Sequence, residues 1–193
     1  MICRLLMAMV ALLLLTANVD AMTLDGQCEF QFFSKSTLHK FDGKGACQPF
    51  TMSSEKTTQG EEHVRNPEVD VLVKGMNSDN SSRDEKMYVM FESDHYPVIK
   101  SKFKDLDPEI ILQQIDDKGD QPGHLDFNLQ IRDVTKPVQA TTRELLVTPE
   151  KVSFEMEFNI SLADYGLKPP SILGLIRVDD QVRVNVMVSL TRH

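Results

Sequence analysis

Two runs near the C-terminus alternate apolar and polar residues almost without a fault, and they constrain the fold more than any other feature. In Val152–Ile160 every second residue is apolar, and Val182–Leu190 repeats the pattern mainly with valine. A side-chain period of two is typical of β-strands, and polar alternates place one face of the sheet in water. All-parallel sheets rarely have a wet face, so these runs predict antiparallel sheet with a continuous apolar wall. Such a wall either packs shut or surrounds something apolar.

Further segments with strand character recur at regular spacing, and one helical signal interrupts them. The other expected strands cover residues 28–33, 46–52, 67–73, 98–106, 110–115, 124–131 and 138–147, and 53–65 is interpreted as an exposed polar loop. Asn80 offers a helix N-cap, Met87, Met90 and Phe91 recur at helical spacing, and Pro97 ends the helical stretch before it. About eight strands with one short inserted helix predict an all-β sandwich or barrel.

The N-terminus has the pattern of an export signal. A short basic start precedes an unbroken apolar run, Leu5–Leu15, and small residues stand where a signal peptidase reads, up to Ala21. An apolar run of this length is short for a membrane span, which favours a cleaved signal peptide over an uncleaved anchor. The sequence therefore predicts a signal peptide at 1–21, a single domain at 22–193, and a periplasmic or secreted location.

Two cysteines remain after removal of the signal peptide, Cys28 and Cys47. In an oxidising compartment such a pair usually forms one disulfide, and the turn-prone stretch 41–45 lets the chain fold back between them. The alternative, a metal or redox site, lacks the close spacing of a Cys-x-x-Cys motif.

Composition and motifs argue against most other functions. The net charge of −8 and the lack of a basic stripe disfavour nucleic acid as a partner. No histidine pair has metal-ligand spacing, and no Gly-x-Ser-x-Gly nucleophile motif is present. His95 follows Asp94, which fits a metal ligand or a base but equally a helix cap and turn. We therefore expect no enzyme, no metal and no cofactor.

The apolar wall itself is the remaining candidate site. An antiparallel barrel of about eight strands has an interior that is filled by side chains or holds one small ligand. Tryptophan is absent and slender valines recur on the expected strands, which favours internal space. The residues alone leave both interpretations open, as they do a homodimer through an exposed edge strand.

Three segments together resemble the YceI-like family, exported lipocalin-like barrels associated with polyisoprenoid binding. In 82–99, an Arg-Asp pair, a short helix and an Asp-x-Tyr-Pro turn match the family pattern. In 123–138, Val-Thr-Lys-Pro-Val matches, although Asp133 stands where the family usually has glycine. In 158–175, a Ser-x-x-Asp-Tyr-Gly corner precedes the last strand. The resemblance covers most of 69–190, and before it only 36–43 is comparable.

The resemblance implies an antiparallel lipocalin-like β-barrel that carries a long hydrophobic ligand without catalysis. Its partner would be a polyisoprenoid, an isoprenoid quinone or a fatty-acyl lipid. Alternation selects the expected ligand-binding residues: Phe30, Phe32, Val71, Val73, Leu125, Phe127, Leu129, Phe154, Met156, Phe158, Val184 and Val186. An error of one residue in the register of a strand would turn all of its selected residues to the other face. Tyr165 and His95 are the candidate head-group contacts. The rival hypothesis is a structural or interaction barrel with a packed core that acts through its acidic surface.

Overall fold

Long antiparallel strands dominate the structure, as the alternating patterns predict. A computed structural model describes residues 23–56, 62–64, 67–104, 122–169, 171–172 and 176–192. The elements in chain order are β1 (Thr23–Lys35), β2 (Lys40–Ala46), β3 (Phe50–Lys56), β4 (Glu62–Val64), β5 (Glu68–Leu72), the 3-10 helix η1 (Val73–Gly75), α1 (Ser81–Met90), β6 (Val98–Lys102), β7 (Gly123–Ile131), β8 (Val134–Val147), β9 (Lys151–Ser161), the 3-10 helix η2 (Ala163–Tyr165), β10 (Ser171–Ile172), β11 (Ile176–Arg177) and β12 (Gln181–Arg192).

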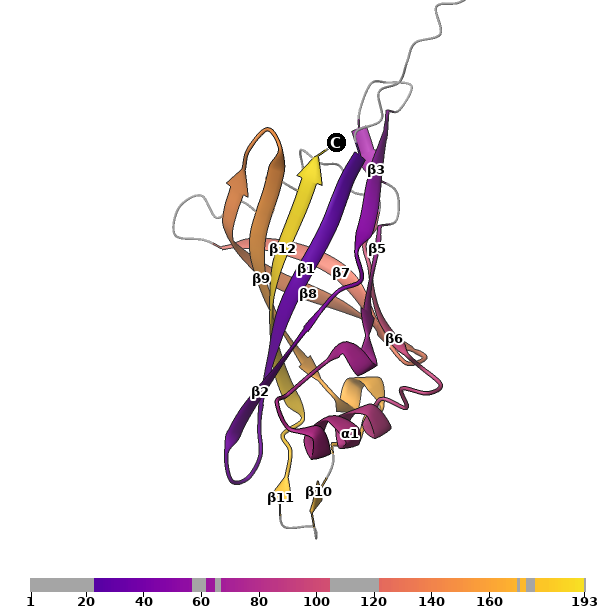
Figure 1. Ribbon diagram of the computed structural model, residues 1–193, viewed down its shortest axis with the longest axis vertical. Helices are drawn as coiled ribbons and strands as arrows, with labels where there is room; N and C mark the ends of the chain where they lie inside the picture. Colours follow the sequence, from indigo (N-terminus) through magenta and orange to yellow (C-terminus); the bar gives the residue numbers. More distant parts are fainter. Residues whose placement is uncertain are drawn as a thin grey trace, which may run out of the picture.

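One strongly curled sheet contains most of these strands (Figure 1). Its order is β4-β3-β1-β12-β9-β8-β7-β6-β5, and β2 pairs with the second half of β1. β2 and β3 behave as one interrupted strand, because β2 pairs with Glu29–Lys35 of β1 and β3 pairs with Thr23–Gly26. Counted in this way, eight antiparallel strands form the curl, with β4 as a short addition. The expected all-β, lipocalin-like barrel with one inserted helix is confirmed.

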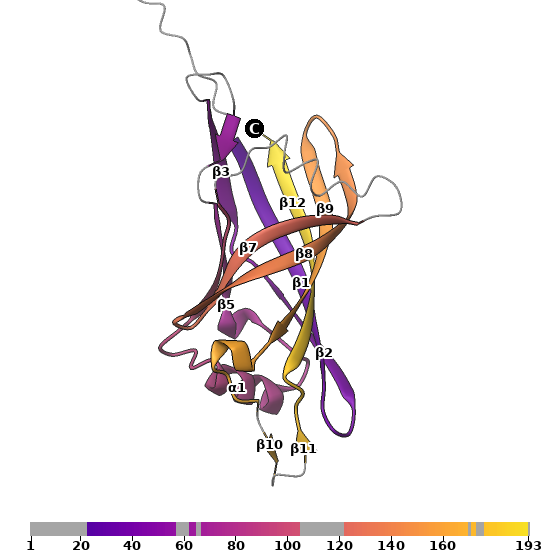
Figure 2. The ribbon, with the colours of Figure 1, turned by 180° about the vertical axis from the view of Figure 1, so that it is seen from behind.

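The two flanks of the curl meet along a short seam between the β2–β3 strand and β5. The Lys44 and Asn77 backbones exchange two hydrogen bonds, of 2.7 and 2.8 Å, and the Gln48 amide donates to the Asp70 carbonyl at 2.7 Å. Both ribbon views show β3 and β5 side by side (Figures 1 and 2). These three bonds close the sheet where a regular ladder is missing. We call residues 44–48 together with 70–77 the seam.

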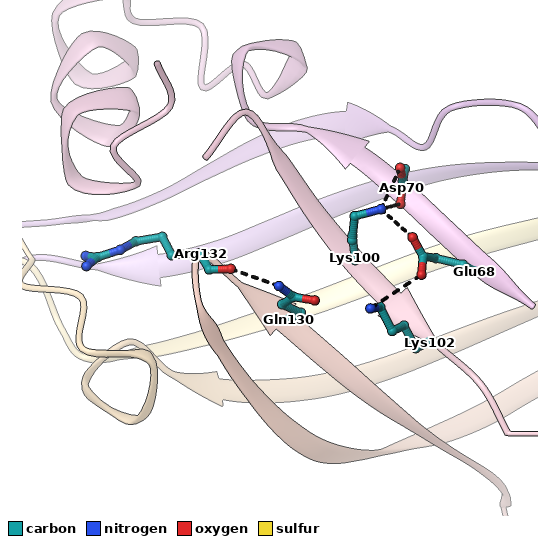
Figure 3. Close-up of polar contacts among 6 residues, drawn as sticks. All are labelled: Glu68, Asp70, Lys100, Lys102, Gln130 and Arg132. Carbon is teal, nitrogen blue, oxygen red and sulfur yellow. Dashed lines mark hydrogen bonds and ion pairs between the residues drawn. The ribbon is translucent and has the colours of Figure 1, made fainter. Parts of the chain in front are cut away.

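Charged side chains tie the neighbouring strands β5 and β6 together on the outer face (Figure 3). The Lys100 ammonium contacts the Glu68 carboxylate and lies 3.3 Å from that of Asp70, and Lys102 lies 3.5 Å from Glu68. The hydrogen bond from Lys100 lowers the pKa of Glu68, and the same contact raises the pKa of Lys100. The ion pairs therefore stabilise β5, which ends the sheet on this side.

The helices gather at one end of the curl (Figure 2). The predicted N-cap is confirmed, since the Asn80 side chain accepts a hydrogen bond from the Arg83 amide at 3.1 Å. The Tyr88 hydroxyl donates to the Met76 carbonyl at 2.6 Å, which fixes α1 against the segment that follows η1. Beyond α1, the Arg132 guanidinium in the β7–β8 turn pairs with Glu92 at 3.0 Å. Both contacts hold the C-terminal part of the helix and the turn after it against the rest of the structure.

Several predicted boundaries differ from the structure. The expected strand at 46–52 spans the break between β2 and β3, and β8 begins at Val134 rather than at 138. The expected exposed loop at 53–65 is wrong at 53–56 and 62–64, which form the end of β3 and all of β4, and its other residues lie outside the described ranges. Ser54 and Val64 there are buried, because β3 pairs with β4. The polar composition of the segment does not indicate this pairing. The expected strand at 110–115 and the signal peptide at 1–21 lie outside the described residues.

Candidate ligand cavity

A narrow cavity of about 330 Å³ runs inside the curled sheet. Its lining residues on β1 extend from Leu24 to Ser34, roughly 33 Å of strand at about 3.3 Å per residue. Ligand pockets occupy about 300–1,000 Å³, so this volume lies at the small end of their range. A small volume spread over this length is the shape of a tunnel rather than of a round pocket.

The two alternating runs at the C-terminus supply one side of this tunnel. Strands β9 and β12 are paired with Val184 opposite Phe158 and Val186 opposite Met156. Every second residue of each run, counted from Val152 and from Val182, lines the cavity, as the alternation predicts: Val152, Phe154, Met156, Phe158, Ile160, Val182, Val184, Val186, Val188 and Leu190. The polar alternates consequently lie on the outer face of the sheet.

Phenylalanine–glycine pairs shape the neighbouring side of the tunnel, since β1 pairs with β12. In the registers of β1 with β2 and β3, Phe32 faces Gly43, Phe30 faces Gly45, and Phe50 faces Gly26. A Cβ atom on any of these glycines would lie closer than 3.0 Å to the ring of its partner. Each ring therefore lies over the bare glycine backbone, flat against the sheet. All three phenylalanines line the cavity, and this arrangement keeps their rings out of its centre.

Ten of the twelve residues expected to bind ligand lie in the cavity lining: Phe30, Phe32, Val71, Leu125, Leu129, Phe154, Met156, Phe158, Val184 and Val186. Val73 and Phe127 do not. Val73 lies in η1, where strand alternation has ended, and it is buried. Phe127 faces inward on β7, but its ring packs 5.4 Å from that of Phe103 and 5.3 Å from that of Phe158. It fills the core beside the tunnel.

The two expected head-group contacts lie away from the cavity lining. Tyr165, in η2, is only 2% exposed and belongs to the hydrophobic core. Burial, with a smaller contribution from the Asp164 charge, raises the pKa of Tyr165 to about 12. His95 is exposed in the turn after α1, with its ring edge-on to Tyr96 at 4.5 Å. Alternation and motif order cannot locate the ends of a cavity, because these ends form only when the sheet curls.

Helix α1 closes one end of the tunnel and contributes residues that the strand patterns did not reveal. Met87, Met90 and Phe91, the predicted apolar side of the helix, all line the cavity. Arg83 lines it too, and its guanidinium carbon lies 4.6 Å from the ring centroid of Phe41. Residues 83, 87 and 90 share a helical face, so the same spacing would have identified Arg83.

The predicted disulfide is present, since Cys28 and Cys47 are bonded with their Cα atoms 5.3 Å apart. Cys28 lies on β1 and also lines the cavity, whereas Cys47 lies in the break between β2 and β3. No group of three or more His, Cys, Asp or Glu side chains in the described ranges could hold a metal ion. Across the same ranges, no helix combines the length and hydrophobicity that crossing a membrane requires.

Comparison with known families identifies the chain. The family model of the YceI-like domain matches residues 25–190, which is most of the sequence. The chain belongs to the YceI-like family. This match covers α1 and all or nearly all of each of the eight strands of the barrel, and it confirms the resemblance carried by the three segments in 82–175.

Solved structures agree with this assignment at the level of the fold. BcnA from Burkholderia cenocepacia superposes with a TM-score of 0.59 at 10% identity, over 84% of this chain and 95% of BcnA. A polyisoprenoid binding domain from Saccharophagus degradans, implicated in plant cell wall breakdown, superposes with a TM-score of 0.56 at 14% identity, over 86% of this chain and 97% of that domain. A search of curated proteins found no match. The YceI-like architecture is therefore shared despite very low sequence identity.

Proposed function

We propose that this protein is an exported carrier that holds one long hydrophobic chain inside its barrel, without catalysing a reaction. The observation that carries the proposal is the tunnel, which is apolar along both its β1 side and its β9–β12 side. Its narrow form suits an extended isoprenoid or acyl chain better than a ring system. The similar domain from Saccharophagus degradans binds polyisoprenoid, which supports this class of ligand.

The driving force for binding would be the removal of apolar surface from water. This transfer contributes about 25 cal/mol for each Å² buried, before the cost of ordering the chain. The ten lining residues found by alternation would supply part of that contact. Export is part of the proposal and rests on the signal-like pattern at 1–21 and on the disulfide, since disulfides persist in oxidising compartments.

The direct test is mass spectrometry of an organic extract from protein purified without detergent. We expect one long-chain isoprenoid, quinone or acyl lipid in stoichiometric amount. An empty extract, combined with failure to take up any of these lipids when they are added, would refute the carrier. It would favour the structural or interaction barrel instead.

A matched pair of variants ties ligand retention to the tunnel. Met156 lines the cavity on β9, whereas Met187 lies on the neighbouring strand β12 and is exposed on the outer face. Met156→Lys should abolish lipid retention, because a charge in an apolar site costs several kcal/mol of desolvation. Met187→Lys adds the same charge outside the tunnel and should retain lipid. Retention of lipid by folded Met156→Lys would contradict the assignment.

A further inference from the structure

We infer that the α1 end of the tunnel binds an anionic head group, and that Arg83 is the residue that recognises it. This inference rests on the proposed carrier function and deepens it by naming the chemical class of the ligand. The class is a single-chain lipid with a terminal oxyanion, either a carboxylate or a phosphate. Arginine suits both, since its planar fork donates two parallel hydrogen bonds to either group.

The charges in the tunnel lining single out this position. Among the described residues that line the cavity, only Arg83 and Arg192 are charged, and no carboxylate lines it. Arg192 is exposed in the last residues of β12, whereas Arg83 is half-buried. A guanidinium beside apolar side chains is partly desolvated, so an anion there is attracted more strongly than at an exposed site.

Other polar groups gather around Arg83. Phe41 lies beneath its guanidinium and is opposite Ser34 in the β1–β2 register, so Ser34 is at the same end. Ser78 also lines the cavity and is tied to the start of α1 through Asp84. The polar lining residues Ser34, Ser78 and Arg83 thus share the α1 end, beside the apolar side chains of the helix. At the other end Leu24 pairs with Met52, and Leu190 with Val152, so apart from Arg192 the lining there is apolar.

In the part of the chain that the structure describes, the Arg83 guanidinium forms no ion pair, because the nearby carboxylates have other partners. Asp84 is buried and accepts hydrogen bonds from the Ser78 amide at 2.9 Å and from the Ser78 hydroxyl at 2.6 Å. Asp79 pairs with Lys44 at 3.7 Å. The cation–π contact with Phe41 holds the Arg83 side chain without using its hydrogen-bond donors in the guanidinium plane. Those donors are available to a ligand.

The test compares ligands that share a chain and differ in the head group. Hexadecanoic acid is paired with hexadecanol, and geranylgeranyl phosphate with geranylgeraniol. Each displaces the neutral dye Nile red from the delipidated full-length mature protein. We expect the anionic member of at least one pair to bind more tightly than its alcohol. Which pair shows the preference distinguishes a carboxylate from a phosphate.

Variants at the two ends of the tunnel assign the preference to a residue. Arg83→Gln should weaken binding of the preferred anion roughly tenfold, as expected for losing a hydrogen bond to a charged group, and leave its alcohol unchanged. Arg83→Lys keeps the charge and should restore part of the preference. Arg192→Gln is the matched control at the opposite end and should change neither ligand.

Three results would overturn the inference. They are equal binding of acid and alcohol in both pairs, an equal loss of both ligands in Arg83→Gln, and a preference that is lost in Arg192→Gln instead. Failure of all four ligands to displace the dye would refute the carrier function itself, and the head-group site with it. That outcome differs from equal binding of acid and alcohol, so failure of the carrier function can be told apart from failure of the head-group site alone.

Discussion

At the scale of single residues, the width of the tunnel depends on what stands opposite each inward-facing aromatic ring. Phe32 would project toward the centre of the barrel if its cross-strand neighbour had a side chain. Gly43 has none, so the ring lies against the sheet. Glycine weakens a strand interior, but it is the residue type that allows another group to approach the backbone this closely. The Phe–Gly pairs therefore lower the stability of the strands and enlarge the space inside the barrel.

Gly43→Ala should narrow the tunnel and destabilise the fold. Its Cβ would overlap the Phe32 ring, and overpacking of this kind typically costs about 1–3 kcal/mol. Urea unfolding and Nile red affinity report the two effects. Gly75→Ala is the control, since its Cβ would meet only the Leu72 Cβ at an ordinary 3.7 Å. Equal midpoints and affinities for the two variants would contradict this account of the tunnel.

Tyr165 predicts a dependence of stability on alkaline pH. Burial raises its pKa to about 12 in the folded protein, whereas an unfolded tyrosine ionises near pH 10. Between pH 10 and pH 12 the unfolded state binds fewer protons than the folded state, so the free energy of unfolding should fall by roughly 3 kcal/mol as the pH rises. Tyr165→Phe should remove this contribution. An identical slope for wild type and Tyr165→Phe, from urea unfolding at each pH, would show that Tyr165 is not its source.

At the scale of elements, the interrupted strand β2–β3 is held unequally on its two sides. Toward β1 it has two ladders and the Cys28–Cys47 disulfide. Toward β5, the described residues make just the three backbone hydrogen bonds of the seam. Cys47 directly precedes Gln48, which makes one of those bonds. The disulfide therefore positions the strand edge on which closure of the barrel depends.

Removal of the disulfide should loosen this region first. A Cys28→Ser, Cys47→Ser double variant should lose roughly 3 kcal/mol of stability, the chain-entropy contribution of a loop of this size. Thermal unfolding with and without a reductant measures the effect. The reductant should lower the midpoint of the wild type and leave the double variant unchanged. An unchanged wild-type midpoint after verified reduction would contradict a stabilising role.

At the scale of the whole molecule, closure is uneven around the barrel. β12 pairs with β9 along eleven residue positions, from Gln181 to Thr191, whereas the seam lacks a regular ladder. Local opening is easiest where backbone bonds are fewest. The seam is consequently the expected line of opening for a ligand that enters from the side.

Amide hydrogen exchange can test whether the seam opens more easily than the β9–β12 ladder. The amides of Lys44, Gln48 and Asn77 should exchange faster than those hydrogen-bonded between β9 and β12. A bound chain stabilises the closed state, so loading with lipid should slow the seam amides most. Uniform protection around the barrel, or no change at the seam on loading, would argue against lateral opening.

Sequence patterns predicted well those features that depend on local periodicity. The inner faces of β9 and β12, the Asn80 cap and the Cys28–Cys47 bond are all found in the structure. Strand ends were less predictable, because Val73 continues the alternation in sequence but lies in η1. Phe127 shows a further limit, since an inward-facing residue lines the tunnel only if no other side chain covers it.

The sequence by itself determined that this chain forms antiparallel strands with one apolar face, because the direction of a side chain on a strand depends only on its position along that strand. The tertiary structure alone decided whether the apolar faces enclose a space. That outcome depends on which residues meet across strands, as Phe32 and Gly43 do, and on α1 closing one end. It also brought Arg83 to the end of the tunnel, where neither Tyr165 nor His95 reaches. These contacts join residues far apart in sequence, so the periodic pattern of a single strand or helix cannot predict them.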